Sequence, residues 1–354
     1  MSRFFSERYK DTVPYVPGEQ PKDMQYIKLN TNESPFPPSP RAQALAAEAA
    51  RNLQLYSDPQ CKVLNEKAAE MFGISTDEVL FGNGSDELLY FAFMAFCDDQ
   101  HPVAFPDITY GFYSVYARFL GINAQQIPLK DDFSIDVNDY IGLNKTIFIA
   151  NPNAPTGLAL TLSDIEAIVK SNPNNVVVID EAYVDFGWES AIPLIHKYDN
   201  LLVIQTLSKS RSMAGGRLGF AVGSKALISD MNTIKFSTNP FNVNRMSMAA
   251  GLGALADEEY FRTNCRKIIE NRQWTTQQLR QLGFTVIDSM TNFVLAKHPE
   301  LDGKGLYLKL KENGILVRHF DTPRLRDYNR ITIGSMQEMQ ALVSTIGRIL
   351  EDGL

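Results

Sequence analysis

Two stretches of sequence decide the fold: Asn175-Val-Val-Val-Ile-Asp-Glu-Ala-Tyr183 and Asn200-Leu-Leu-Val-Ile-Gln-Thr-Leu-Ser-Lys209. In each, an apolar run typical of a buried parallel strand ends directly at polar side chains. Ligands bind at the carboxyl edge of the strands in open α/β sheets. The two stretches therefore predict a parallel sheet whose edge presents an acid, a phenol and an amine, from Asp180, Tyr183 and Lys209.

The rest of the chain fits an α/β protein with two domains. Short apolar segments alternate with helical ones between Val79 and about Gly223, which indicates a mostly parallel sheet covered by helices. The predicted strands are Val79-Leu-Phe, Pro102-Val-Ala-Phe, Thr146-Ile-Phe-Ile-Ala, Val176-Val-Val-Ile, Leu201-Leu-Val-Ile and Leu218-Gly-Phe-Ala-Val. The later strands and helices indicate a smaller α+β unit. We expect a proline-rich arm that joins part of the small domain at 1–40, a large domain at 41–245 and a small domain at 246–354.

Composition argues against several classes of protein. The chain has 354 residues with a formal net charge of −7, so we expect neither a nucleic acid nor an anionic membrane as partner. No run of apolar residues is long enough to span a bilayer. The three cysteines and four histidines are scattered, which predicts no metal site and no disulfide framework. We therefore expect a cytoplasmic protein.

The acid, the phenol and the amine suit the chemistry of pyridoxal 5'-phosphate. Lys209 can form an imine with the aldehyde of this cofactor, Asp180 can keep the pyridine nitrogen protonated, and Tyr183 can hydrogen-bond the ring phenolate. Taken singly, Lys209 also fits a solvated loop lysine and Asp180 a helix cap. Their occurrence together favours the cofactor.

A phosphate-binding site is predicted at the start of a helix. Gly82-Asn-Gly-Ser-Asp-Glu87 follows a strand and opens an apolar helical run, so backbone N–H groups near Ser85 and Asp86 can receive a phosphate. Arg217, on a glycine-rich return to a strand, can grip the same phosphate, and Ser208 offers a hydroxyl. A capping box without ligand and a surface ion pair are the alternatives.

Other candidates lie on predicted loops and strand ends. Asn151-Pro-Asn-Ala-Pro-Thr-Gly157 forms a rigid loop whose amide can hold the cofactor phenolic oxygen and a substrate carboxylate, although it also fits plain turn chemistry. Tyr110 can stack on the pyridine ring, or pack in the core with its aromatic neighbours. Arg330 is a candidate clamp for a carboxylate, with Arg318 as a second cation, and ordinary solvation of strand ends is the alternative for both.

Several motifs in this order carry a family resemblance: Lys28-Leu-Asn-Thr-Asn-Glu-Ser-Pro-Phe-Pro-Pro38, Tyr56-Ser-Asp-Pro-Gln60, Asp180-Glu-Ala-Tyr183, Pro240-Phe-Asn-Val-Asn244 and Arg330-Ile-Thr-Ile-Gly334. From about Tyr15 to Leu350, the chain resembles the histidinol-phosphate aminotransferase family, in the class II subgroup of fold-type I enzymes that depend on pyridoxal phosphate. The resemblance implies a mostly parallel seven-stranded sheet between helices, a smaller α+β domain, and a homodimer with shared active sites.

The resemblance also implies roles for individual residues. The catalytic residues would be Lys209, Asp180 and Tyr183. The cofactor-binding residues would be Ser85, Asp86, Tyr110, Asn153, Asp180, Tyr183, Thr206, Ser208, Lys209 and Arg217, with Tyr56 reaching across from the partner subunit. The substrate-binding residues would be Tyr15 on the covering arm, Asn32, Arg318 and Arg330. Ala154 stands where related enzymes place an amide that contacts the cofactor, so either Asn153 supplies that hydrogen bond or it is missing.

The implied activity is a ping-pong transamination in histidine biosynthesis, from histidinol phosphate to 2-oxoglutarate, with Lys209 as general acid and base. The implied partners are thus a small-molecule amino donor and a 2-oxo acid. A transaminase for phenylalanine or tyrosine is a close alternative on the same scaffold. A phosphothreonine decarboxylase and a non-catalytic protein that binds the cofactor are further alternatives.

Overall fold

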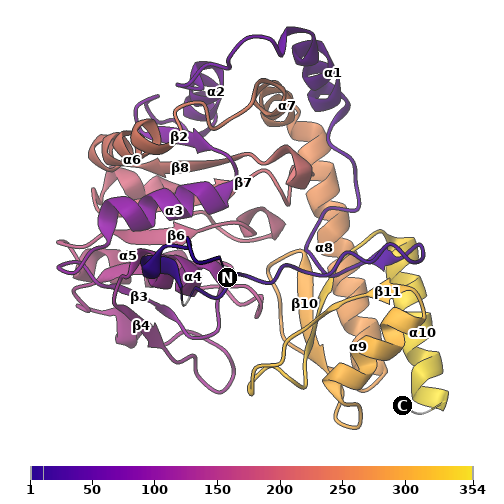
Figure 1. The fold of residues 1–354 in the computed structure, drawn as a ribbon. Coiled ribbons are helices and arrows are strands. Elements are labelled where there is room, and N and C mark those ends of the chain that lie inside the picture. Colours follow the sequence, from indigo (N-terminus) through magenta and orange to yellow (C-terminus); the bar gives the residue numbers. More distant parts are fainter. Residues whose placement is uncertain (1, 11, 353–354) are drawn as a thin grey trace.

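A seven-stranded sheet forms the centre of the larger part of the molecule (Figure 1). The computed structural model describes residues 2–10 and 12–352. The strands of this sheet are β2 (Val79–Gly82), β3 (Val103–Pro106), β4 (Ala124–Ile127), β5 (Thr146–Ala150), β6 (Val177–Asp180), β7 (Leu201–Thr206) and β8 (Gly219–Gly223). Their order is β2-β8-β7-β6-β5-β3-β4. Only the two pairings of β8 are antiparallel, so the predicted α/β fold with a mostly parallel seven-stranded sheet is confirmed.

Helices cover both faces of this sheet. They are α1 (Pro40–Ala49), α2 (Lys62–Phe72), α3 (Ser85–Phe96), α4 (Phe112–Leu120), α5 (Leu162–Ser171), α6 (Lys225–Thr238) and α7 (Arg245–Ala256). Buried side chains of α3, α4 and α6 pack on one face, and those of α1, α2, α5 and α7 on the other. Short 3-10 helices lie at Glu7–Tyr9, Ala50–Asn52, Val137–Tyr140, Val184–Phe186, Ile192–His196 and Ala214–Gly216.

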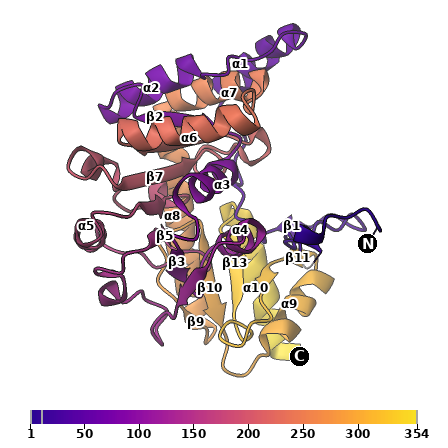
Figure 2. The same ribbon diagram turned by 60° about the vertical axis from the view of Figure 1, so that its left-hand side comes forward.

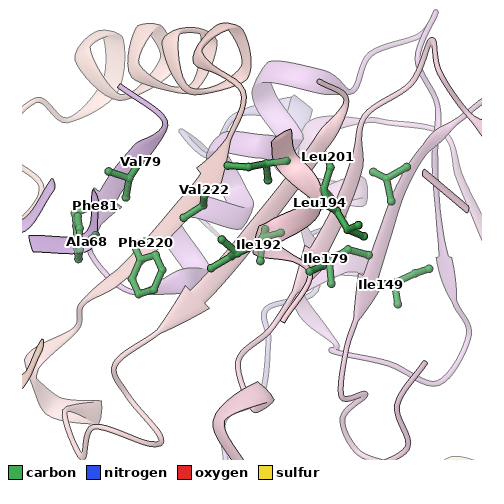
Figure 3. Packing of buried hydrophobic residues seen from close by; sticks show 14 of the residues in the cluster. Ala68, Val79, Phe81, Ile149, Ile179, Ile192, Leu194, Leu201, Phe220 and Val222 are labelled. Carbon is green, nitrogen blue, oxygen red and sulfur yellow. The ribbon is translucent and has the colours of Figure 1, made fainter. Parts of the chain in front are cut away.

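The alternation of side chains along β6 determines which face of the sheet Asp180 lies on. Val177 and Ile179 belong to one apolar layer, in which Figure 3 labels Ile179. Val178 belongs to the layer on the opposite face, as the two-residue period of a strand requires. Each such branched side chain contributes about 1.5–3 kcal/mol when it is fully buried. Asp180 follows in the same register, and therefore lies on the face that α3 and α4 cover.

The smaller part of the molecule surrounds a four-stranded antiparallel sheet with the order β12-β13-β10-β9. Its elements are α8 (Glu258–Gln281), β9 (Thr285–Val286), β10 (Phe293–Lys297), α9 (Gly303–Glu312), β11 (Ile315–Leu316), β12 (Arg318–His319), β13 (Asn329–Thr332) and α10 (Met336–Asp352). The N-terminal segment joins it through β1 (Ile27–Lys28), which pairs in parallel with β11 (Figure 2). Residues just after β1 are thereby fixed beside the small sheet.

The domain boundaries at residues 40 and 245 stay predictions. Met248, Ala254 and Leu255 of α7 pack with the core of the large sheet, while α8 runs from there toward the small sheet (Figure 1). Within the described part of the chain, every helix is too short or too polar to cross a membrane.

Candidate active site

A cavity of about 270 Å³ opens at the carboxyl ends of β5, β6 and β7. It brings together most of the predicted cofactor-binding residues, namely Ser85, Asp86, Tyr110, Asp180, Tyr183, Thr206, Ser208, Lys209 and Arg217. Thr31 and Glu33 line it as well. Because these residues come from the arm, the large sheet and its loops, the cavity exists only in the folded chain.

Asp180 is a buried acid held by two donors. Its Oδ2 accepts a hydrogen bond from the hydroxyl of Tyr113 at 2.8 Å, and its Oδ1 accepts one from the backbone N–H of Ala182 at 3.2 Å. Burial raises the pKa of Asp180 to about 6, against the pull of these hydrogen bonds. A buried carboxylate of this kind gains from a cationic N–H partner.

Lys209 lines the same cavity, three residues beyond the end of β7. Its Nζ donates a hydrogen bond to the backbone carbonyl of Thr31 at 3.2 Å. Burial, and next the positive charge of Arg330, lower the pKa of Lys209 to about 8. Such an amine is neutral in part of the molecules near neutral pH, and the neutral form is the nucleophile and the base.

Tyr183 is oriented by the arm. Its hydroxyl accepts a hydrogen bond from Nδ2 of Asn32 at 2.9 Å, and its ring meets Phe293 edge-on with the centroids 5.1 Å apart. Asn32 is itself fixed, since its backbone N–H donates to Oγ1 of Thr332 at 3.0 Å. The predicted substrate contact of Asn32 remains untested, but its amide already serves to hold the phenol.

The N-terminus of α3 forms an anion cradle. No side chain caps this helix, and Ser85 and Asp86 of its first turn line the cavity with Arg217. The guanidinium of Arg217 donates to Oδ2 of Asp86 at 2.9 Å and lies over Gly84, whose φ is +84°. A Cβ on Gly84 would come within 2.5 Å of Nη2 of Arg217, so this close approach depends on glycine.

Arg330 lies beside the cavity with one donor unused. Its Nη2 donates to the carbonyl of Asn30 at 3.0 Å, while its buried Nε has no hydrogen-bond partner among the described residues. Burial lowers the pKa of Arg330. Arg318 is its register partner on β12, so the two predicted substrate-binding cations are neighbours. A bound anionic group would offset the positive charge of the two arginines and would accept a hydrogen bond from the unpaired Nε of Arg330.

The geometry does not support Asn153 as a cofactor ligand. Its Nδ2 donates to the carbonyl of Ile108 at 2.9 Å and to Oγ1 of Thr156 at 3.1 Å, and its Oδ1 accepts from Thr109 at 2.8 Å. The side-chain amide of Asn153 therefore forms hydrogen bonds within the loop and with the neighbouring segment at residues 108–109. Ala154, not Asn153, lines the cavity.

Two further predicted residues lie outside the cavity lining. The ring of Tyr15 packs on Phe112 with the centroids 4.3 Å apart, which holds the arm against α4. Tyr56 is 81% exposed and stacks on Phe241. Neither residue contributes to the cavity within this single chain, and the roles predicted for them stay predictions.

Sequence reasoning missed three contributors: Tyr113, Thr31 and Glu33. Tyr113 lies in the first turn of α4, and its ring is nearly perpendicular to that of Tyr110, which precedes the helix. The sequence shows a cluster of aromatic residues there, but not that the hydroxyl of Tyr113 reaches Asp180. For Thr31 and Glu33 the only local signal is their place within the polar stretch after β1, because the fold alone brings the arm to Lys209.

The residues present fit pyridoxal phosphate. Its phosphate matches an uncapped helix N-terminus with an arginine and hydroxyls, and its ring nitrogen matches a buried acid. Its phenolic oxygen matches Tyr183, and its aldehyde matches the amine of Lys209. All of these groups line one cavity.

Known proteins that are similar to this chain are aminotransferases. The family model of aminotransferase class I and II matches residues 24–346. Histidinol-phosphate aminotransferase of Brachyspira hyodysenteriae is 50% identical over 99% of this chain and 100% of its own length, and that of Clostridium acetobutylicum is 48% identical over 98% and 99%. The fold matches the crystal structure of histidinol-phosphate aminotransferase from Sinorhizobium meliloti in complex with pyridoxal-5'-phosphate, with a TM-score of 0.91, 24% identity, and 99% of both chains covered.

Proposed function

The chain belongs to the aminotransferase class I and II family, and from that premise we propose that it is a histidinol-phosphate aminotransferase of histidine biosynthesis that uses pyridoxal phosphate. The observation that carries the proposal is the meeting of Lys209, Asp180 and the anion cradle in one cavity. The full-length similarity to histidinol-phosphate aminotransferases supports the choice of substrate.

The proposed cofactor would be held by three sets of groups. The first turn of α3, Ser208 and Arg217 would bind its phosphate, Asp180 its ring nitrogen and Tyr183 its phenolic oxygen. When bound, pyridoxal phosphate supplies an aldehyde that condenses with amines and a ring that withdraws electrons. Tyr110 lines the same cavity and would cover one face of the ring.

Lys209 would carry the proton transfer. Its lowered pKa leaves a share of neutral amine near neutral pH, so it can take a proton from the substrate α-carbon and later return one. Asp180 would stay ionised beside the cationic ring nitrogen, because an opposite charge favours the charged form of a buried acid. Asn32 would keep the hydroxyl of Tyr183 in place.

Arg330 would bind the anionic group of either substrate. Its unused Nε can donate to the phosphate of histidinol phosphate or to the α-carboxylate of glutamate, with Arg318 as the neighbouring cation. The same clamp can thus serve both halves of a ping-pong reaction. The other reactant would be 2-oxoglutarate, which takes up the amino group.

The proposal includes a homodimer. The ring of Tyr56 is exposed and stacked on Phe241, and the backbone carbonyl of Tyr56 accepts a hydrogen bond from Arg245. Leu53 and Leu55 are exposed next to it. A second subunit would cover these apolar side chains and receive Tyr56 at its cofactor phosphate.

The test is a comparison of amino donors. The purified protein should bind pyridoxal phosphate with a visible absorption band, and should transaminate histidinol phosphate far faster than phenylalanine, without release of carbon dioxide. Lys209→Ala should abolish multiple turnover. A preference for phenylalanine would support the aromatic transaminase, and release of carbon dioxide would support the decarboxylase. A Lys209→Ala variant with normal turnover would overturn the assignment of this lysine.

A further inference from the structure

Glu33 is a third acid in the cavity, and it has no part in holding the proposed cofactor. Asp180 faces the site of the ring nitrogen, and Asp86 holds Arg217 and Tyr110 with its two oxygens. Glu33 instead lines the cavity from the arm, next to the segment whose carbonyl accepts from Lys209. An acid in the cavity wall can contact a molecule bound in the cavity.

Only one oxygen of Glu33 is engaged. Its Oε2 accepts from Nζ of Lys28 at 2.6 Å and from Oγ1 of Thr31 at 2.8 Å. Its Oε1 accepts no hydrogen bond from any residue that the structure describes. The carboxylate is therefore oriented by two donors on one side and keeps an acceptor on the other.

Lys28 fixes both the position and the charge of this acceptor. It belongs to β1, which is paired with β11 of the small domain, so the ion pair is anchored to regular structure. Burial opposes ionisation, but the hydrogen bonds from Lys28 and Thr31 outweigh it and hold the pKa of Glu33 below its ordinary value. Glu33 is thus a carboxylate at neutral pH, in a pair with no net charge.

We propose that Oε1 of Glu33 accepts a hydrogen bond from a side-chain N–H of the amino donor, and so selects an imidazole ring over a purely apolar ring. The inference rests on the proposed function and names the residue that sets its specificity. An apolar ring bound there would leave the desolvated carboxylate without a partner, and sites built for a polar group reject analogues that lack it. Since Lys28 neutralises the acid, the acidic return substrate is not excluded.

The test compares two donors in variants of Glu33. In Glu33→Ala, kcat/KM for histidinol phosphate should fall about tenfold to a hundredfold, mainly through KM, since hydrogen bonds to charged groups have effects of this size. The loss with glutamate, which has no N–H in its side chain, should be at least about ten times smaller. Glu33→Gln keeps an acceptor oxygen and should recover part of the activity with histidinol phosphate.

Glu166→Ala is the matched control. Glu166 also accepts from a lysine and a hydroxyl, Lys197 at 3.3 Å and Tyr198 at 3.0 Å, and its side chain is 34% exposed against 40% for Glu33. Glu166 lies on α5, outside the cavity lining, so its substitution should change kcat/KM with neither histidinol phosphate nor glutamate.

The outcomes separate the two proposals. A wild-type enzyme that transaminates phenylalanine but not histidinol phosphate would overturn the proposed function. If the wild-type enzyme prefers histidinol phosphate and Glu33→Ala loses activity equally with both donors, or loses none, the inference on Glu33 alone is overturned.

Discussion

The hydroxyl of Tyr113 donates a hydrogen bond to Oδ2 of Asp180 at 2.8 Å, which links α4 to the end of β6 beneath the cavity. Burial raises the pKa of Asp180 to about 6, and the hydrogen bond from Tyr113 opposes that rise. In Tyr113→Phe the carboxylate loses that donor, so its pKa should rise further. Binding of the cofactor needs the ionised form of Asp180. As pH is lowered, the affinity of Tyr113→Phe for the cofactor should therefore begin to fall at a higher pH than that of the wild type. Titrations of pyridoxal phosphate binding across pH would check this, and identical pH profiles would contradict it.

Asp180→Asn should stabilise the cofactor-free protein at neutral pH while it abolishes turnover. The folded pKa of about 6 exceeds the ordinary value of 3.8, so the folded state binds the proton more tightly than the unfolded chain. Asp180 therefore costs stability as pH rises through this window, and the full cost remains above it. The gain from the substitution should be of the order of 1–3 kcal/mol at neutral pH.

The pH dependence supplies the control for this prediction. The difference in the free energy of unfolding between the two proteins should shrink as pH falls toward 4, where the buried acid is protonated. Urea unfolding of both cofactor-free proteins at several pH values would measure it. An Asp180→Asn protein less stable than the wild type at every pH would contradict the burial argument.

How far the sequence predicts the fold depends on the burial of each element. The central strands are apolar on both faces and were found at nearly the predicted residues. The predicted strand segments did not include β4, because it is an edge strand with Gln125 and Gln126 exposed and no apolar run. Its presence follows from pairing with β3, which no local pattern reveals.

For the site, residues at strand ends were predictable and residues brought by the arm were not. Asp180 and Lys209 stand where apolar runs stop, which is a local signal. The partner of Tyr183 lies 151 residues away, at Asn32, and only the folded arm shows that contact. For Asn153 the loop sequence shows that an amide is present but not where it points. In the structure its Nδ2 donates to the carbonyl of Ile108 and to Oγ1 of Thr156.

Loss of the amide of Asn32 should lower turnover by releasing the phenol. Asn32 has a φ of +54°, a conformation that glycine adopts freely and alanine does not. Both Asn32→Gly and Asn32→Ala remove the donor to Tyr183, and both should reduce kcat about tenfold, as expected for one hydrogen bond. Only Asn32→Ala should also lose about 1 kcal/mol of stability from backbone strain. Steady-state kinetics with thermal unfolding would separate the two effects, and full activity in Asn32→Gly would show that the amide does not hold the phenol.

Gly84→Ala should weaken cofactor binding by displacing an arginine. The added Cβ would lie 2.5 Å from Nη2 of Arg217, so the guanidinium must shift from its present place against Asp86. Loss of a charged donor to phosphate should weaken the binding of pyridoxal phosphate roughly tenfold to a hundredfold. Gly73→Ala is the matched control, because Gly73 also has a positive φ but nothing lies within 4 Å of the added Cβ. Gly73→Ala, at an αL position, should lose about 1 kcal/mol of stability, and Gly84→Ala, whose ψ of 165° lies in a region nearly restricted to glycine, should lose about 1–3 kcal/mol. Only Gly84→Ala should lose affinity for the cofactor in equilibrium titration. Equal affinities in the two variants would mean that Arg217 does not contribute to phosphate binding.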